Sequence, residues 1–297
     1  MTEETTILES TLFPPGYGDF ALQSSDGLIC HISRHILAYM SETFRDMFSL
    51  PAPEGKEEQS TESHTPLELT ESGQILELFL THIDPKRQNL RIDPSAIISL
   101  LEMARKYQVP TITEWFESEA TLKHEGMNNS QVFASEPFIE AHPILALYCA
   151  ANFNLSTIGQ FALQVFASCH ESRTQPTVQF LDIPSYLEGA KLRESRRKLF
   201  ATIISQLADL RQGGLSASYS GTTCSICTRS LCGWILTIER AVTYEPSWRA
   251  FMGAYGQCPE PRCGCRKLKW SGQFKKELVE WERKVKTAES SMPAWPF

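Results

Sequence analysis

The stretch Asp19–Phe48, with the sequence DFALQSSDGLICHISRHILAYMSETFRDMF, decides the fold. Two short apolar runs, Phe20–Leu22 and Leu28–Ile32, flank the pair Asp26-Gly27. Glycine readily adopts the positive φ that a tight turn requires, so this pattern predicts a β-hairpin. Apolar residues then recur at steps of three and four, the spacing that places side chains on one face of a helix. They are Ile36, Leu37, Met40, Phe44, Met47 and Phe48.

The sequence that follows predicts more helices and a further strand. Ser41 lies at the N-cap position of a second short helix within the opening stretch. Leu67 and Leu69 alternate with polar residues, which is typical of a short strand. Asp93-Pro94 is a typical helix start, with proline in the first turn. Through residue 122 the patterns predict, in order, two strands, two helices, one strand and three helices.

Several residues of the opening stretch carry a family resemblance. They are Asp19-Phe20, the Ser25-Asp26-Gly27 turn, Ile36-Leu37, Ser41, Phe44-Arg45 and Met47-Phe48. Together they resemble the first half of a BTB/POZ domain, and Arg45–Pro53 resembles the BTB proteins of mushroom-forming fungi. That family usually has an aromatic residue on the second strand and a histidine at the start of the first helix. Cys30 and Ser33 occupy those places here, so His31 and His35 are not equivalent to the family's histidine.

The resemblance implies an α+β fold for residues 14–124, a BTB/POZ domain with a short mixed β-sheet packed with helices. It also implies self-association into a homodimer and docking of protein partners, such as a cullin-type ubiquitin-ligase scaffold. Apolar residues beyond the needs of a small core, among them Phe13, Tyr39 and Met40, support the homodimer. The loop that helps known scaffold binders to contact the cullin reads His82–Arg91 here and differs from theirs, so the cullin role stays open.

The patterns after residue 129 are helical. The clearest is Ser156–His170, where apolar residues recur at alternating steps of three and one. Pro184 opens a longer helix that is expected to break near Gly189 and to end at Gly213-Gly214, because glycine often follows a helix C-cap. These helices predict an all-helical extension over residues 125–214, which resembles the BACK-like extension that follows many BTB domains.

Residues 215–297 are predicted to form a cysteine-containing helical module. Six of the nine cysteines lie there: Cys224, Cys227, Cys232, Cys258, Cys263 and Cys265. Thiolates of Cys224, Cys227, Cys258 and Cys263 could hold a structural zinc ion, with Cys265 as the alternative to Cys263. Two other interpretations stay open. The cysteines can pack as small apolar side chains, or two of them can form a disulfide or redox pair. In the zinc interpretation Cys232 is not a ligand and packs near Trp234.

Composition and missing motifs narrow the function. A net charge of −7 argues against general nucleic-acid binding. No apolar run approaches the roughly 18 residues of a membrane span, and a secretory signal is lacking, so we expect an intracellular protein of the cytoplasm, the nucleus or both.

The sequence contains no phosphate loop, nucleophile elbow or His-Glu-x-x-His motif. Cys169 and His170 are helix neighbours whose side chains diverge by about 100°, so no residue is assigned a catalytic role.

The sequence therefore predicts a non-catalytic protein–protein interaction module that self-associates and docks partners, for example as a ubiquitin-ligase substrate adaptor or a transcriptional regulator scaffold. The alternative is a zinc-dependent nucleic-acid-binding or transcription-regulating protein that uses the C-terminal cysteines and the basic stretch 258–287. That stretch holds nine bases against four acids. Pro51–Thr65 has no periodic apolar residue and is predicted to be a mobile surface loop.

Overall fold

The structure is a computed structural model, and it divides into two compact units, Met1–Phe138 and Ile139–Phe297. It describes residues 8–50, 65–87, 92–121, 137–174, 182–216, 225–257, 272–291 and 293–295. The predicted loop Pro51–Thr65 lies outside these residues except for Thr65, so its mobility stays a prediction.

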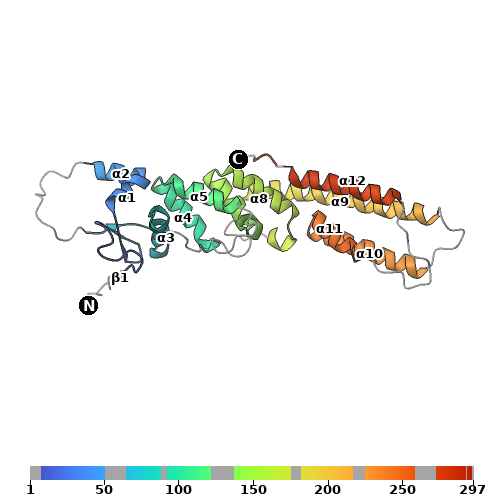
Figure 1. Cartoon of the computed structure of the whole chain (residues 1–297), viewed down its shortest axis with the longest axis horizontal. Helices are drawn as coiled ribbons and strands as arrows, with labels where there is room; N and C mark the ends of the chain where they lie inside the picture. Colours follow the sequence, from blue (N-terminus) through green and yellow to red (C-terminus); the bar gives the residue numbers. More distant parts are fainter. Residues whose placement is uncertain are drawn as a thin grey trace, which may run out of the picture. The chain divides into compact units, whose positions relative to one another are not determined.

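The first unit contains a mixed four-stranded sheet in the order β1-β3-β2-β4 (Figure 1). Its strands are β1 (Leu8–Glu9), β2 (Phe20–Gln23), β3 (Leu28–Ile32) and β4 (Leu67–Glu68). The predicted hairpin is confirmed: β2 and β3 pair antiparallel, and Gly27 in the turn has a φ of 86°. β1 pairs parallel with β3, and β4 pairs parallel with β2. The two-residue β1 is an addition to the predicted order of elements.

Helices pack against this sheet in the predicted order. They are α1 (Arg34–Met40), α2 (Glu42–Ser49), α3 (Gly73–Ile83), the 3-10 turn η1 (Pro94–Ala96), α4 (Ile97–Lys106) and α5 (Pro110–Thr121). Two predicted caps are confirmed. The Ser41 side chain accepts a hydrogen bond from the Phe44 N–H, and Asp93 accepts one from the Ser95 N–H. His31 belongs to β3 and His35 to α1, so the two histidines lie on different elements.

The core of the first unit lies between the sheet and the helices. Large side chains that are fully buried include Phe13, Leu22, Ile32, Phe44, Phe79 and Phe116. Phe13 has no exposed surface, so its predicted availability for self-association is wrong. The backbone explains this burial: the His31 N–H donates to the Phe13 carbonyl at 2.9 Å and holds this residue beside β3.

The second unit is all helical, as predicted. Its elements are α6 (Phe138–Ala141), α7 (Pro143–Phe153), α8 (Ser156–Ser168), η2 (Glu171–Thr174), α9 (Ile183–Ser216), α10 (Ser225–Tyr244), α11 (Trp248–Tyr255) and α12 (Gly272–Ser290). α9 and α12 lie side by side, and the Trp281 indole N–H donates to Gln206 Oε1 at 2.8 Å (Figure 1).

The long helix α9 corrects two predictions. It runs unbroken past Gly189, where a break was expected, and continues to Ser216 through Gly213-Gly214. A Cβ atom on Gly189 would lie 2.8 Å from the Phe166 ring of α8, so this glycine allows a close helix contact. Its role is packing rather than helix termination.

Residues from α9 and from the three helices after it share one apolar core. Its buried members are Phe200, Ile203, Leu207, Trp234, Ile238, Val242, Trp248, Phe251, Ala254, Trp281 and Val285. α9 thus packs with helices on both sides of the predicted boundary at residues 214 and 215. The predicted division of the chain into three domains, 14–124, 125–214 and 215–297, stays a prediction.

Two buried arginines on α9 bind the ends of neighbouring helices. Arg193, 4% exposed, donates from Nη1 to the Phe166 carbonyl at 3.1 Å and the Cys169 carbonyl at 2.6 Å, and from Nη2 to the Tyr244 carbonyl. Arg196, 8% exposed, donates to the carbonyls of Gln164 and Ala288. Burial lowers the pKa of both guanidinium groups. Because carbonyls at a helix end carry partial negative charge, these cations stabilise the junction of α8, α9, α10 and α12.

Candidate protein interaction surface

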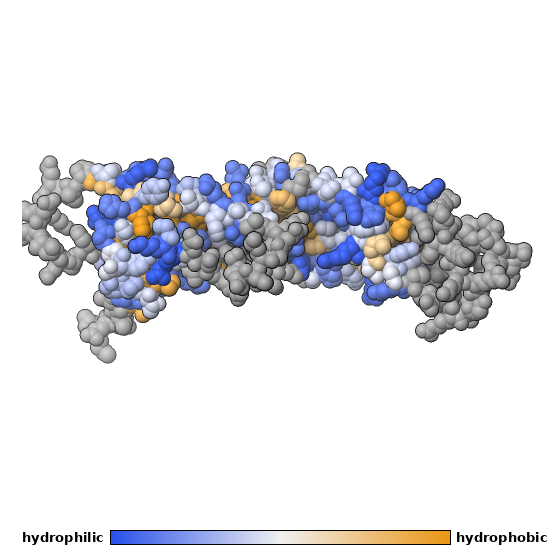
Figure 2. Space-filling model, viewed as in Figure 1, coloured by the Kyte–Doolittle hydropathy of each residue, from blue (hydrophilic) through white to orange (hydrophobic). Residues whose placement is uncertain are grey.

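The first unit presents an apolar and aromatic surface on α1, which we call the α1 face and define by His35, Ile36 and Tyr39. These residues occupy positions i, i+1 and i+4 of the helix and therefore share one side of it. Tyr39 is 86% exposed, His35 is exposed, and Ile36 is half-buried. Figure 2 shows apolar residues among polar ones around α1 and α2. An aromatic ring this exposed is a ready anchor for a protein partner.

Two further exposed apolar side chains lie in the same unit. Leu8 on β1 is 58% exposed, and Leu50, the C-cap residue of α2, is 71% exposed. Among the described strands β1 lies at one edge of the sheet, with β3 beside it. An edge strand has backbone N–H and C=O groups that can pair with another strand. The first unit thus offers a partner two kinds of contact: side chains on the α1 face and main-chain groups on the edge strand β1.

The side of α1 that carries Arg34 is held rigidly. Asp19 accepts a hydrogen bond from the Arg34 N–H at 2.8 Å, which caps the start of α1. The Arg34 guanidinium lies 5.3 Å from the centre of the Phe20 ring and 5.1 Å from that of Phe48. These cation–π contacts fix α1 and α2 to β2 and so position the α1 face.

The carboxylates of the hairpin serve as caps. The backbone N–H of Arg34 is the main cause that lowers the pKa of Asp19. Hydrogen bonds from the Ser24 hydroxyl and the Gly73 N–H lower the pKa of Asp26. Asp26 lies in the hairpin turn and accepts from the first residue of α3 at 2.8 Å. Both carboxylates favour the ionised acceptor form, which suits capping better than proton transfer.

The connection after α3 is fastened to the chain that precedes β2. Asp84 is 1% exposed and accepts a hydrogen bond from the Tyr17 hydroxyl. The Arg87 guanidinium lies 4.9 Å from the Phe13 ring centre and 5.0 Å from that of Tyr17. Of the stretch His82–Arg91, which was compared with cullin-contacting loops, the structure describes residues 82–87. His82 and Ile83 belong to α3, so the connection begins two residues later than predicted.

The predicted zinc ligands lie largely outside the described residues. Cys224, Cys258, Cys263 and the alternative Cys265 are outside them, and Cys227 is described only as part of the α10 backbone. The zinc site therefore stays a prediction. Within the part of the chain that the structure describes, no three or more His, Cys, Asp or Glu side chains gather at a metal-binding distance.

The described cysteines show contrasting environments. Burial raises the pKa of the Cys30 and Cys149 thiols to about 12, so both stay protonated and behave as apolar core residues. Cys232 is exposed on α10, and its predicted packing near Trp234 is wrong. Trp234 instead lies inward, where its indole N–H donates to the Ala254 carbonyl at 3.1 Å. Positions 232 and 234 are two apart on a helix and face different sides.

The adjacent Cys169 and His170 do not form a reactive pair. The Cys169 thiol points to the Phe166 carbonyl at 3.7 Å, and burial raises its pKa. The His170 ring stacks on Tyr244 and bonds to the Ser172 hydroxyl through Nδ1 at 2.9 Å. The predicted helix through His170 is wrong, because α8 ends at Ser168 with Cys169 as its C-cap, so the divergence of helix neighbours does not apply to this pair. The two side chains contact different groups.

A groove of about 530 Å³ lies on the first unit between the start of α3 and α4. Its charged residues are Glu71, Glu102, Arg105 and Lys106. The Lys106 ammonium donates to Glu71 Oε1 and to the Thr70 hydroxyl, each at 2.8 Å. Burial favours the neutral form of Glu71, but the hydrogen bond and charge of Lys106, together with hydrogen bonds from the Glu71 backbone and from Tyr107, outweigh burial and lower the pKa of Glu71. The groove therefore presents charges of both signs and suits a polar contact with a protein surface.

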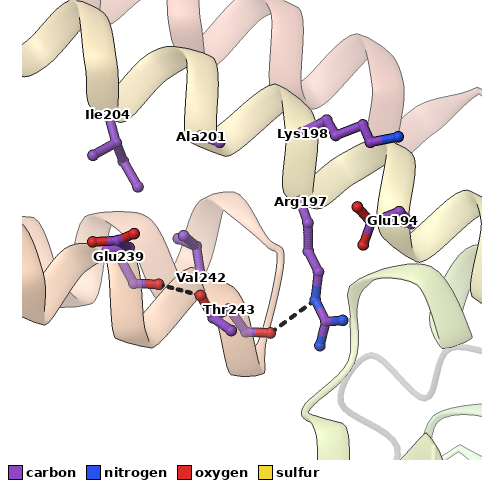
Figure 3. Close-up of a pocket in the computed structure, with 8 residues that line it drawn as sticks. All are labelled: Glu194, Arg197, Lys198, Ala201, Ile204, Glu239, Val242 and Thr243. Carbon is purple, nitrogen blue, oxygen red and sulfur yellow. Dashed lines mark hydrogen bonds between the residues drawn. The ribbon is translucent and has the colours of Figure 1, made fainter.

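A smaller groove of about 300 Å³ lies between α9 and α10 of the second unit (Figure 3). Glu194, Arg197 and Lys198 line it from α9, and Glu239 lines it from α10 (Figure 3). Arg197 reaches across and donates from Nε to the Thr243 carbonyl at 3.1 Å (Figure 3). This bond lies at the C-terminal end of α10, so the groove is part of the junction between the two helices.

Comparisons with known proteins agree with this geometry. A family model, described as the BTB/POZ domain, matches residues 12–123. No curated protein and no solved structure matches the chain. Among the described residues, no helix has both the length and the apolar character needed to cross a membrane. The match covers strands β2, β3 and β4 and the helices α1 to α5, which include the α1 face, whereas β1 lies just before it. Residues 12–123 therefore form a BTB/POZ domain, a fold for protein–protein interaction.

Proposed function

We propose that this protein is a non-catalytic adaptor whose BTB/POZ domain self-associates into a homodimer through the α1 face and the edge strand β1. The observation that carries the proposal is the 86% exposure of Tyr39 on α1. Burying a large aromatic ring at a symmetric interface removes apolar area from water, which favours association.

The support from β1 is independent of the helix. A second copy can add its own edge strand to β1, and main-chain hydrogen bonds then contribute to affinity. Leu8, exposed on β1, would be covered in the same step. A C2 dimer uses each contact twice, so two modest patches per copy suffice for an interface.

Partner docking is the second part of the proposal. We expect protein partners on surfaces of the chain that the homodimer leaves free, and the 530 Å³ groove is one such surface of mixed charge. A cullin-type scaffold stays one candidate partner. In the stretch His82–Arg91, which corresponds to the loop of known cullin binders, Arg87 makes contacts within the domain, since its guanidinium stacks on Phe13 and Tyr17.

The test is sedimentation velocity of the full chain across micromolar concentrations. We expect a dimer for the wild type, and for Tyr39→Glu a dissociation constant raised at least about tenfold, which corresponds to about 1.4 kcal/mol. Leu236→Ser is the matched control, since Leu236 is 62% exposed on α10 of the other unit and should leave the dimer unchanged. A monomeric wild type, or equal weakening by both substitutions, would contradict the proposal. Circular dichroism verifies that each variant is folded.

A further inference from the structure

The helix α8 contains a glycine whose missing side chain leaves room for an aromatic ring. Gly159 is buried in the first half of this helix. A Cβ atom on it would lie 2.4 Å from the Cδ2 and Cε3 atoms of the Trp295 indole. Any other residue at position 159 would therefore have to displace the indole. We call this position the Gly159 notch.

The surroundings of the notch are apolar. Leu163 lies one turn after Gly159 on the same side of α8 and is 1% exposed, and Leu155, the N-cap residue just before the helix, is 3% exposed. A glycine between two leucines at this spacing forms a gap in the row of side chains. A flat ring can enter such a gap and contact the helix backbone, which gives a dense apolar contact.

The chain that leads to Trp295 is attached to the same group of helices. The Ala288 carbonyl accepts from Arg196 Nη2 at 3.4 Å, and the Glu289 carbonyl accepts from the Gln164 side-chain amide of α8. Glu289 Oε1 accepts from the Trp248 N–H, the first residue of α11, at 2.7 Å. A carboxylate at a helix start also interacts favourably with the helix dipole. These bonds direct the segment that carries Trp295 toward the notch.

Glycine inside a helix destabilises it relative to alanine, so its presence at position 159 needs a gain elsewhere. The contact with Trp295 supplies that gain. The sequence also restricts the backbone around the indole, since Trp295 lies between Pro293 and Pro296. Proline fixes its own φ and restricts the residue before it to extended conformations, which lowers the entropy lost on docking.

We propose that the Gly159 notch is a binding site for a tryptophan carried on a proline-flanked, extended segment, and that Trp295 of the same chain is its resident occupant. The notch is then closed in the folded chain. A segment tethered to its own site acts at a local concentration of about millimolar, so a free peptide of similar sequence competes poorly with it. Removing the Trp295 indole opens the site to such a peptide.

The first test uses the full chain and a fluorescein-labelled peptide of sequence SMPAWPF, which copies residues 291–297. By fluorescence anisotropy we expect saturable binding to the Trp295→Ala variant and at least about tenfold weaker binding to the wild type. Binding should vanish when Gly159→Leu is added to Trp295→Ala, and when the peptide's tryptophan is replaced by alanine. Equal binding to all variants, or binding to none of them, would overturn the proposal.

The second test needs no change at Trp295. Gly159→Ala should lower the melting temperature of the full chain, because the added methyl group displaces the indole. Gly233→Ala is the matched control: it lies within α10, and a Cβ atom there would meet nothing within 4 Å. Its melting temperature should stay equal or rise, as helix propensity predicts. If both substitutions raise the melting temperature equally, the notch does not hold the indole and the proposal is wrong.

Discussion

Ser41 shows how one hydroxyl group connects two helices of the BTB/POZ domain. It accepts a hydrogen bond from the Phe44 N–H at 3.2 Å and donates one to the Tyr107 carbonyl at 2.5 Å. The residue is 1% exposed, so water cannot replace either bond. The cap could be predicted from sequence, whereas the bond to Tyr107 joins residues 66 positions apart and could not.

We expect Ser41→Ala to lower the free energy of unfolding by about 1–2 kcal/mol, because it removes the cap and leaves a buried carbonyl without its donor. Urea denaturation of the full chain measures this change. Ser49→Ala is the control: the Ser49 hydroxyl donates to the Asp46 carbonyl in an exposed position. Its effect should stay within about 0.5 kcal/mol. Equal effects of the two substitutions would show that burial of Ser41 does not matter.

His82 makes the first unit sensitive to mild acid. Its Nδ1 lies 2.8 Å from the Leu78 carbonyl, its ring centre lies 4.3 Å from that of Trp115, and burial lowers its pKa below 6.5. The unfolded chain therefore binds a proton more readily than the folded one, and stability falls as the pH drops below about 6.5. We expect the melting temperature to fall between pH 7.5 and pH 5.5, and to fall less in His82→Phe.

The difference in acid response between the wild type and His82→Phe measures the contribution of this histidine. The carboxylates Asp19, Asp26 and Glu71 do not interfere. Their pKa values are lowered from 3.8 for the aspartates and 4.5 for the glutamate, so their contributions are lost at more acidic pH. An unchanged acid response in His82→Phe would disprove the role of this histidine.

Most elements could be predicted from local patterns, and the errors share a cause. The hairpin, the caps and the strongly periodic helices depend on residues a few positions apart. Burial of Phe13 and exposure of Cys232 depend on which distant segment lies beside them, which periodicity does not encode. The two-residue strand β1 is too short for a periodic signal. Likewise Gly189 was interpreted as a break because its partner, Phe166, is on another helix.

That contact gives a prediction for α9. Gly189→Ala should lower the free energy of unfolding by about 1–3 kcal/mol, because the added methyl group meets the buried Phe166 ring at 2.8 Å and overpacks the helix contact. Gly253→Ala is the control, since a Cβ atom at that position of α11 meets nothing within 4 Å. It should be neutral or stabilising by up to about 1 kcal/mol. Stabilisation by both substitutions in urea denaturation would exclude the close contact.

For the whole molecule, sequence patterns and the family resemblance predicted an α+β domain followed by helices. The α+β domain and the helices after it are both confirmed. The candidate interaction surface was predicted in part. Tyr39 was named and is exposed, but Phe13 was named and is buried. The groove between α3 and α4 escaped prediction, because its lining comes from residues 70–75 and 99–106, which only folding brings together.

The zinc hypothesis concerns the whole C-terminal region and has a direct test. We expect about one zinc per wild-type chain by elemental analysis and almost none in Cys224→Ser or Cys258→Ser, because each would lose one of four thiolate ligands. Cys232→Ser is a suitable control, since Cys232 is exposed on α10 and is not among the proposed ligands. A metal-free wild type of normal stability would show that these thiols are ordinary side chains.

The buried arginines of α9 have a consequence for the tolerance of this fold to sequence change. Arg193 and Arg196 bind carbonyl oxygens, which every amino acid supplies, so the residues they hold can vary in side chain without losing the bond. The two donors have no such freedom. Lysine offers a single ammonium on a flexible stem and cannot reach several carbonyls with the planar geometry of a guanidinium. Drift among relatives should therefore accumulate at positions such as 169 and 288 long before it reaches 193 or 196.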